Sequence, residues 1–303
     1  MRIWCRRAAA AALASSLVLG AGLTQGVSMA SASTPAARVH GIGPASMKAG
    51  VWKRTYPYSS QYGDASTMDV YLPPAAVGKH GLKLPTVVLV HGGAWTAGDR
   101  SDMAPQAYQF ARNGFVAISV NYRLATTAAW PAQRLDVSRA VSYVRKNAGF
   151  FDVDTKRVGL FGSSAGGQIA AAVATLGNGG QRFKGLVVLS GLLNPLTIAQ
   201  QDPEYSDSVV PDDLLRCEPA DCPDRYLDAV PAMALNQSDP PSLLFHSRNE
   251  APFGPQQAQE FVNLSRSVGV NSKLKMLSGT QHGIEYWTRV KPTVIAWFKS
   301  HLR

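Results

Sequence analysis

The sequence predicts an α/β fold with a mostly parallel central sheet and helices on both faces. Apolar, β-branched runs such as TVVLV at 86–90 are typical of strands buried on both faces of a sheet. These runs alternate with stretches of helical character along the chain, as they do when helices connect parallel strands.

Eight strands are expected from the apolar runs. In chain order they are 51–58, 67–72, 86–90, 115–120, 157–161, 186–189, 242–245 and 273–277. Gly63-Asp64 supplies turn residues between the first two strands, and Pro73-Pro74 ends the second because proline cannot donate a ladder hydrogen bond.

Five helices are expected between and after these strands. They are 104–112, 132–147, 166–176, 255–268 and 288–301. Apolar residues recur at helical spacing in 132–147, where Val137, Val141 and Val144 share one face. The stretch 166–176 is rich in alanine, the strongest helix former.

The segment 191–240 breaks the alternation and shows no strong periodicity. It holds ten of the chain's 20 acidic residues but only two basic ones. A long irregular insertion in one domain is usually a functional loop, so we expect a lid or cap insertion before the strand at 242–245. Because the net charge of +10 divides into an acidic insertion and a basic remainder, it gives no reason to expect a nucleic-acid partner.

The N-terminus is predicted to be a secretory signal peptide over 1–32. Arg2, Arg6 and Arg7 precede an uncharged stretch at 8–26, and Ala30-Ser31-Ala32 gives an A-x-A cleavage pattern. The apolar stretch is short and interrupted by glycine, so no stable membrane anchor is expected. The protein is then secreted, with a flexible leader at 33–50 and a catalytic domain at 51–303; the export route, Sec or twin-arginine, stays open.

Cleavage would remove Cys5 and leave Cys217 and Cys222. In an exported chain, two cysteines this close are expected to form a local disulfide. Two cysteines with no histidine nearby do not make a structural zinc site, and the acidic segment has no calcium-loop pattern, so no metal or other cofactor is expected.

The sequence GSSAG at 162–166 follows an expected strand and precedes an expected helix. G-x-S-x-G in this setting is typical of a sharp turn that lifts a nucleophilic serine, here Ser164, above the sheet. Upstream, His91-Gly92-Gly93-Ala94-Trp95 follows the strand at 86–90. Backbone N–H groups of Gly92, Gly93 or Ala94, with that of Ala165, are therefore predicted to form an oxyanion hole.

A serine nucleophile needs a base and an acid. Of six histidines, His282 is the one in a flexible loop after a strand, at 273–277, where α/β sheets place catalytic groups. Glu250 follows the strand at 242–245 and completes the order serine, acid, histidine. Asp239 precedes that strand, so it is expected at the opposite edge of the sheet.

Together these motifs resemble an α/β-hydrolase of the carboxylesterase/lipase group with an HGG oxyanion motif. The chain is similar to the hormone-sensitive-lipase-like and bacterial feruloyl-esterase-like enzymes over roughly 51–300. The matching stretches are MDVYLP at 68–73, HGGAWTAGD at 91–99, NYRL at 121–124, Asp136-Val137, GSSAGG at 162–167 and the Glu250 and His282 loops. The resemblance implies that 191–240 shapes the acyl or alcohol pocket.

The chain departs from this family at two positions. The acid loop reads HSRNE at 246–250 where the family usually has HG-x-x-D, so a longer glutamate must take the place of aspartate. Ala94 stands where the lipase-like branch commonly has a third glycine. Trp95 beside it is expected either to wall the substrate pocket or to pack in the core, and Asp99 and Asp136 are expected to be structural.

The sequence therefore predicts a secreted serine carboxylester hydrolase acting on a small-molecule, carbohydrate or lipid ester. Two alternatives stay open. The same triad would serve an amide hydrolase of aryl-formamidase or peptidase type, and a non-catalytic binding protein of this fold would be distinguished by failing to react with a fluorophosphonate.

Overall fold

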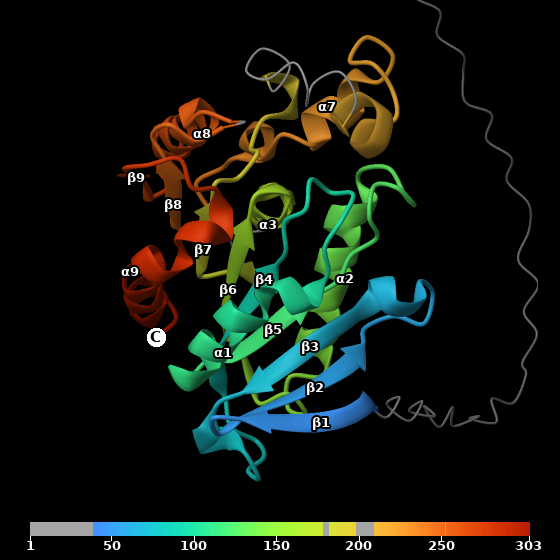
Figure 1. The fold of residues 1–303 in the computed structure, drawn as a ribbon, viewed down its shortest axis with the longest axis vertical. Coiled ribbons are helices and arrows are strands. Elements are labelled where there is room, and N and C mark those ends of the chain that lie inside the picture. The colour runs from blue at the N-terminus through green and yellow to red at the C-terminus, as the bar shows by residue number, and fades with distance from the viewer. Residues whose placement is uncertain (1–38, 178–181, 198–208, 252) are drawn as a thin grey trace, which may run out of the picture. The chain divides into compact units, whose positions relative to one another are not determined.

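A mixed β-sheet forms the centre of the molecule (Figure 1). A computed structural model describes residues 39–177, 182–197, 209–251 and 253–303. Within these residues, nine strands pair in the order β1-β2-β3-β5-β4-β6-β7-β8-β9. They are β1 (Ile42–Lys48), β2 (Val51–Pro57), β3 (Thr67–Leu72), β4 (Leu84–Val90), β5 (Val116–Val120), β6 (Val153–Ser163), β7 (Gly185–Leu189), β8 (Ser242–Ser247) and β9 (Ser272–Leu277). All pairs from β5 across to β9 are parallel, and β1, β2 and β3 join antiparallel, which confirms the predicted sheet.

Helices connect the parallel strands. The α-helices are α1 (Ala104–Arg112), α2 (Ala132–Lys146), α3 (Ala165–Thr175), α7 (Pro223–Asp228), α8 (Gln256–Ser267) and α9 (Trp287–His301). Short turns of helix are η1 (Gly63–Ser66), η2 (Pro74–Ala76), η3 (Arg100–Met103), η4 (Val209–Leu215), η5 (Pro231–Ala234) and η6 (Gly283–Tyr286). None of the helices in the described part of the chain is both long and apolar enough to cross a membrane.

The two faces of the sheet carry separate hydrophobic clusters, and strand β4 supplies both. Its Val88 and Val90 join the cluster formed with α2, α3 and α8, whereas Val87 and Leu89 join the cluster formed with α1 and α9. Alternate side chains of a strand point to opposite faces, so a strand apolar at every position must be covered on both. The expectation of helices on both faces is confirmed (Figure 1).

The N-terminal expectation was wrong in one respect. Residues 42–48, placed by the sequence in a flexible leader, form edge strand β1 against β2. All seven β1 residues are exposed, so this strand has none of the apolar alternation by which strands are recognised. The predicted signal peptide at 1–32, and the leader up to residue 38, lie outside the described residues.

The described parts of the segment 191–240 consist of short elements joined to the body of the domain. Cys217 and Cys222 form the expected disulfide ahead of α7. At the end of α7, Asp228 accepts a hydrogen bond from the Trp130 indole at 2.7 Å and pairs with Arg134 at 3.2 Å. The segment is therefore attached to the N-terminal end of α2 by a polar contact that the sequence did not predict.

Candidate active site

Ser164 lies at the turn where β6 ends and α3 begins. Its φ of +55° and ψ of −128° belong to a region that a residue with a side chain seldom occupies, and its N–H donates to the Leu189 carbonyl at 2.9 Å. Two glycines make the turn possible. A Cβ atom on Gly166 would lie 2.1 Å from the His91 carbonyl oxygen, and one on Gly162 would lie 2.2 Å from the Gly166 oxygen. The serine is thus presented on a tight, strained turn.

The loop after β4 passes directly beside this serine. A Cβ atom on Gly92 would lie 3.1 Å from the Cβ atom of Ser164. Gly93 and Ala94 follow with φ values of +110° and +47°, so the loop turns sharply directly after Gly92. Ala165 is the first residue of α3, where the N–H has no partner within the helix. The structure therefore places Gly92 and Ala165 next to Ser164, with Gly93 and Ala94 in the same loop.

Trp95 packs in the core, which is the second of its two expected roles, and it does not wall a substrate pocket. Its side chain is 0% exposed and its indole N–H donates to Gln168 Oε1 at 3.1 Å. The Gln168 amide in turn donates to the Ala229 carbonyl at 2.7 Å. A fully buried ring leaves no surface for a substrate. Trp95 instead holds the loop 92–95, called the glycine loop below, to α3 through Gln168, and Gln168 joins α3 to the segment after α7.

His91 supports the beginning of the same loop. Its ring stacks on Tyr122 with centroids 4.3 Å apart, and the Tyr122 hydroxyl donates to the His91 carbonyl at 3.1 Å. Burial lowers the pKa of His91. A neutral, enclosed imidazole whose Nδ1 lies 2.8 Å from the Gly92 oxygen serves to fix the loop rather than to exchange protons.

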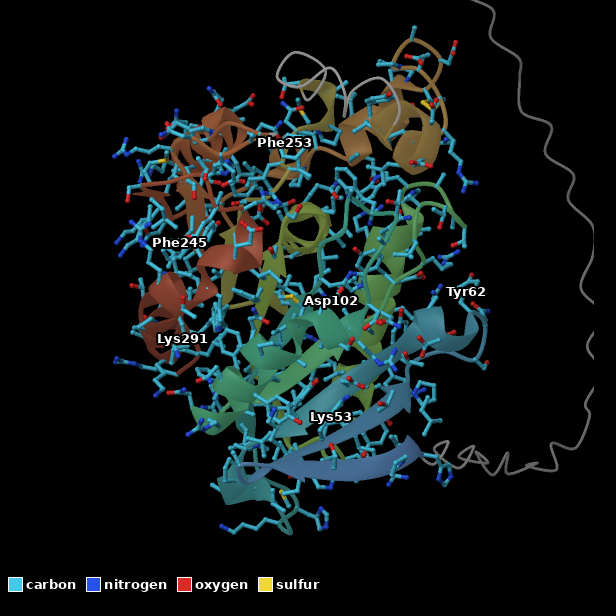
Figure 2. The ribbon with its side chains drawn as sticks, viewed as in Figure 1. Lys53, Tyr62, Asp102, Phe245, Phe253 and Lys291 are labelled. Carbon is cyan, nitrogen blue, oxygen red and sulfur yellow. A yellow bond between two sulfur atoms is a disulfide. The ribbon has the colours of Figure 1, made fainter. Side chains whose placement is uncertain are left out.

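Glu250 and His282 are in contact. Glu250 Oε1 lies 2.5 Å from His282 Nδ1, the glutamate side chain is 0% exposed and the histidine side chain is 29% exposed. A carboxylate on Nδ1 leaves Nε2 as the nitrogen that can accept a proton. In the sequence, Phe245 of β8 precedes Glu250 and Phe253 follows it, and Figure 2 labels both phenylalanines. The ring centroid of Phe253 lies 6.5 Å from that of His282.

The loop 278–283, which carries His282 and is called the histidine loop below, lies against the turn that carries Ser164. A Cβ atom on Gly283, whose φ is +56°, would lie 2.4 Å from Ser163 Oγ. His282 and Ser164 are therefore each one residue away from this close approach. Asp239, the acid rejected on sequence grounds, lies before β8 and accepts a hydrogen bond from the Asn236 N–H at 2.8 Å.

Two other acids are structural, as expected. Asp99 accepts from the Ser101 N–H at the start of η3, and Asp136 is completely buried in a double contact with the Arg123 guanidinium at 2.7 and 2.8 Å. Among the described residues, no cluster of histidine, cysteine or acidic side chains is suited to a metal ion.

Sequence reasoning missed three buried polar residues around the site. Ser190 contacts Oε2 of Glu250, whereas His282 contacts Oε1, and Tyr286 contacts Ser190. Gln168 lies one helical turn beyond Ser164. Only Ser190 carried a signal, because it directly follows an apolar strand at the edge of the sheet where the other functional residues lie.

A family model gives the decisive comparison: the model named BD-FAE matches residues 68–264, nearly two thirds of the chain. The chain belongs to the BD-FAE family. Curated relatives of this BD-FAE member include a probable carboxylic ester hydrolase, LipM, of Mycobacterium tuberculosis, 25% identical and aligned over 74% of this chain and 54% of LipM. The esterase LipC of the same organism is 29% identical over 66% of this chain and 53% of LipC. The chain thus spans about half the length of these relatives.

Solved structures show the same fold as this BD-FAE member. A truncated carbohydrate esterase from gut microbiota superimposes with a TM-score of 0.73 at 21% identity, covering 85% of this chain and 96% of that one. A butyrate-bound esterase from Thermogutta terrifontis gives 0.67 at 18% identity, covering 81% and 93%. At these identities the likeness concerns the fold, which is that of the α/β-hydrolase esterases, as the motifs implied.

Proposed function

We propose that the chain is a secreted serine carboxylester hydrolase that works through an acyl-enzyme on Ser164. The observation that carries the proposal is the 2.5 Å contact between Glu250 Oε1 and His282 Nδ1, in a loop whose next residue lies against Ser163. Names such as carboxylic ester hydrolase and esterase among the relatives favour ester over amide chemistry.

The first half of the reaction forms the acyl-enzyme. His282 Nε2 takes the proton of Ser164 Oγ as that oxygen attacks the ester carbonyl, and the buried carboxylate of Glu250 stabilises the imidazolium. The N–H groups of the Gly92–Ala94 loop and of Ala165 donate to the carbonyl oxygen as it becomes negative. His282 then returns the proton to the departing alcohol.

The second half releases the acid. Water attacks the acyl-enzyme, His282 takes its proton, and the same backbone donors hold the second tetrahedral intermediate. His282 then gives this proton to Ser164 Oγ as the bond between Oγ and the acyl carbon breaks. The segment 191–240 would act as the cap that shapes the substrate pocket. Small-molecule, carbohydrate and lipid esters are the substrate classes to test.

The test combines active-site labelling with a substrate panel. Wild type is expected to react with a fluorophosphonate and to hydrolyse p-nitrophenyl, feruloyl or acetyl-sugar esters faster than matched anilides. Ser164→Ala should abolish both, whereas Ser163→Ala, which removes the neighbouring hydroxyl, should still be labelled.

The remaining triad members and the alternatives are tested with the same reagents. Glu250→Gln should lower kcat by about 10³-fold or more with the label still incorporated slowly. Faster cleavage of anilides than of esters would favour the amide hydrolase. A folded wild-type protein that takes up no label would refute the proposed enzymatic activity and favour a non-catalytic binding protein.

A further inference from the structure

Ser190 is the first residue after strand β7 and is almost fully buried. It is 1% exposed, and its φ of +46° is a conformation that favours glycine. Its N–H donates to the Phe245 carbonyl of the neighbouring strand β8 at 2.9 Å. A serine held in a strained backbone position at the edge where the site residues lie suggests that its side chain has a role there.

The Ser190 hydroxyl joins three parts of the site. It donates to Glu250 Oε2 at 2.7 Å and accepts from the Gly283 N–H, next to His282, at 3.0 Å. It also lies 2.8 Å from the Tyr286 hydroxyl, which in turn contacts the Phe245 carbonyl at 3.1 Å. One oxygen therefore connects the acid loop, the histidine loop and the turn of η6.

The two oxygens of Glu250 have separate partners. Oε1 faces His282, while Oε2 receives the Ser190 hydroxyl and the Ser247 N–H, the latter at 3.1 Å. His246 Nε2 is 3.6 Å from Oε1 and only 2.9 Å from the Phe253 carbonyl. Because the last torsion of a glutamate side chain is soft, donors on Oε2 set the plane in which Oε1 meets the histidine.

We infer that Ser190 is a positioning residue that fixes the Glu250 carboxylate towards His282 and allows a glutamate to serve as the triad acid. A glutamate is one methylene longer than the aspartate of the usual HG-x-x-D loop, and it gains a torsion that must be restrained. The restraint comes from the neighbouring strand, 60 residues away in sequence. This inference rests on the triad of the proposed function.

The first experiment measures kcat, KM and the pH profile of p-nitrophenyl acetate hydrolysis in Ser190→Ala and Ser190→Gly. The glycine variant removes the hydroxyl without backbone strain, so it covers the case in which the alanine variant folds poorly. Both are expected to lower kcat about 10- to 100-fold, the value of a hydrogen bond to a charged group, while KM changes less than about twofold.

The pH profile separates positioning from a merely structural role. Loss of the Oε2 donor leaves more of the negative charge facing the histidine, so the acid-side midpoint of kcat/KM should move to higher pH. Among the described residues, His282, His246 and Tyr286 are the titratable side chains that interact with this carboxylate, and the Glu285 carboxylate accepts from the His282 N–H at 2.9 Å. Ser242→Ala is the matched control: it also removes a buried serine hydrogen bond, to Ser272, and should leave the midpoint unchanged.

A double-mutant cycle tests the link to glutamate. In the Glu250→Asp background the shorter side chain cannot bridge His282 and Ser190, so Ser190→Ala should cost less than about threefold in kcat. Additive losses, or Ser190 variants with wild-type kcat and midpoint, would overturn the inference. The proposed function fails separately, if Glu250→Gln or Ser164→Ala retains wild-type activity.

Discussion

Gly92→Ala gives the most direct test of how closely the glycine loop approaches the nucleophile. The new Cβ atom would lie 3.1 Å from Ser164 Cβ and 3.0 Å from the Ser163 carbonyl oxygen. Carbon atoms in good contact are about 3.5 Å apart or more, so the loop and the serine must separate by about 0.4 Å. The φ of Gly92 lies outside the left-handed region, so the backbone itself accepts alanine.

The expected loss follows from that displacement. A misplacement of 1 Å can cost about 10²-fold in rate, so 0.4 Å costs about 6-fold, and a weakened oxyanion donor adds to it. We expect kcat/KM for p-nitrophenyl acetate to fall about 5- to 100-fold, or about 1–2.7 kcal/mol of barrier, with a nearly unchanged Tm.

The matched control is Gly149→Ala, which adds the same methyl group at a position with open space and no left-handed φ. It should keep full activity. Gly93→Ala should instead fail to fold well, because its Cβ atom would lie 2.2 Å from the Ala97 carbonyl oxygen at a φ of +110°. A Gly92→Ala enzyme with kcat/KM within twofold of wild type would refute the proposed proximity of loop and serine.

Three further predictions concern stability. Asp136→Asn leaves the Arg123 guanidinium without its buried charge partner and should lower the free energy of unfolding by about 2–4 kcal/mol in urea titrations; an unchanged midpoint would contradict this. Asp228→Ala removes the acceptor of the Trp130 indole N–H, so it should lower the free energy of unfolding by about 1–2 kcal/mol and speed proteolysis within 209–235. Equal cleavage rates in the variant and the wild type would show that this contact does not stabilise the segment. Because burial lowers the pKa of His91, the unfolded chain binds a proton in mildly acidic solution that the folded chain does not. The free energy of unfolding should therefore fall as the pH drops below about 6.5, and His91→Phe should lose this part of the pH dependence. Parallel curves of unfolding free energy against pH for the two proteins would contradict the prediction.

Local sequence patterns were sufficient for most of the fold. The run at 86–90 and the valines of 132–147 predicted elements that the structure contains, because burial on both faces or on one helix face leaves a period in the sequence. Strand β1 was not predicted because an exposed edge strand has no such period of apolar residues. The 11-residue β6 was predicted only over 157–161, because its first half is mostly polar and gives no strand pattern.

The sequence also determined which residues the proposed chemistry would use. Glycines at 162 and 166 around Ser164 are required by backbone clashes, and the positions of Glu250 and His282 after strands predict the edge of the sheet on which they lie. Such requirements are local, so they appear in the order of residues along the chain.

Only the tertiary structure decided how these residues are held. Trp95 became a buried support rather than a pocket wall because Gln168, 73 residues away, accepts its indole proton. Ser190 meets Glu250 and Tyr286 across 60 and 96 residues, in contacts that no spacing rule describes. Buried polar groups need partners, and which partner they find depends on how distant strands and helices come together.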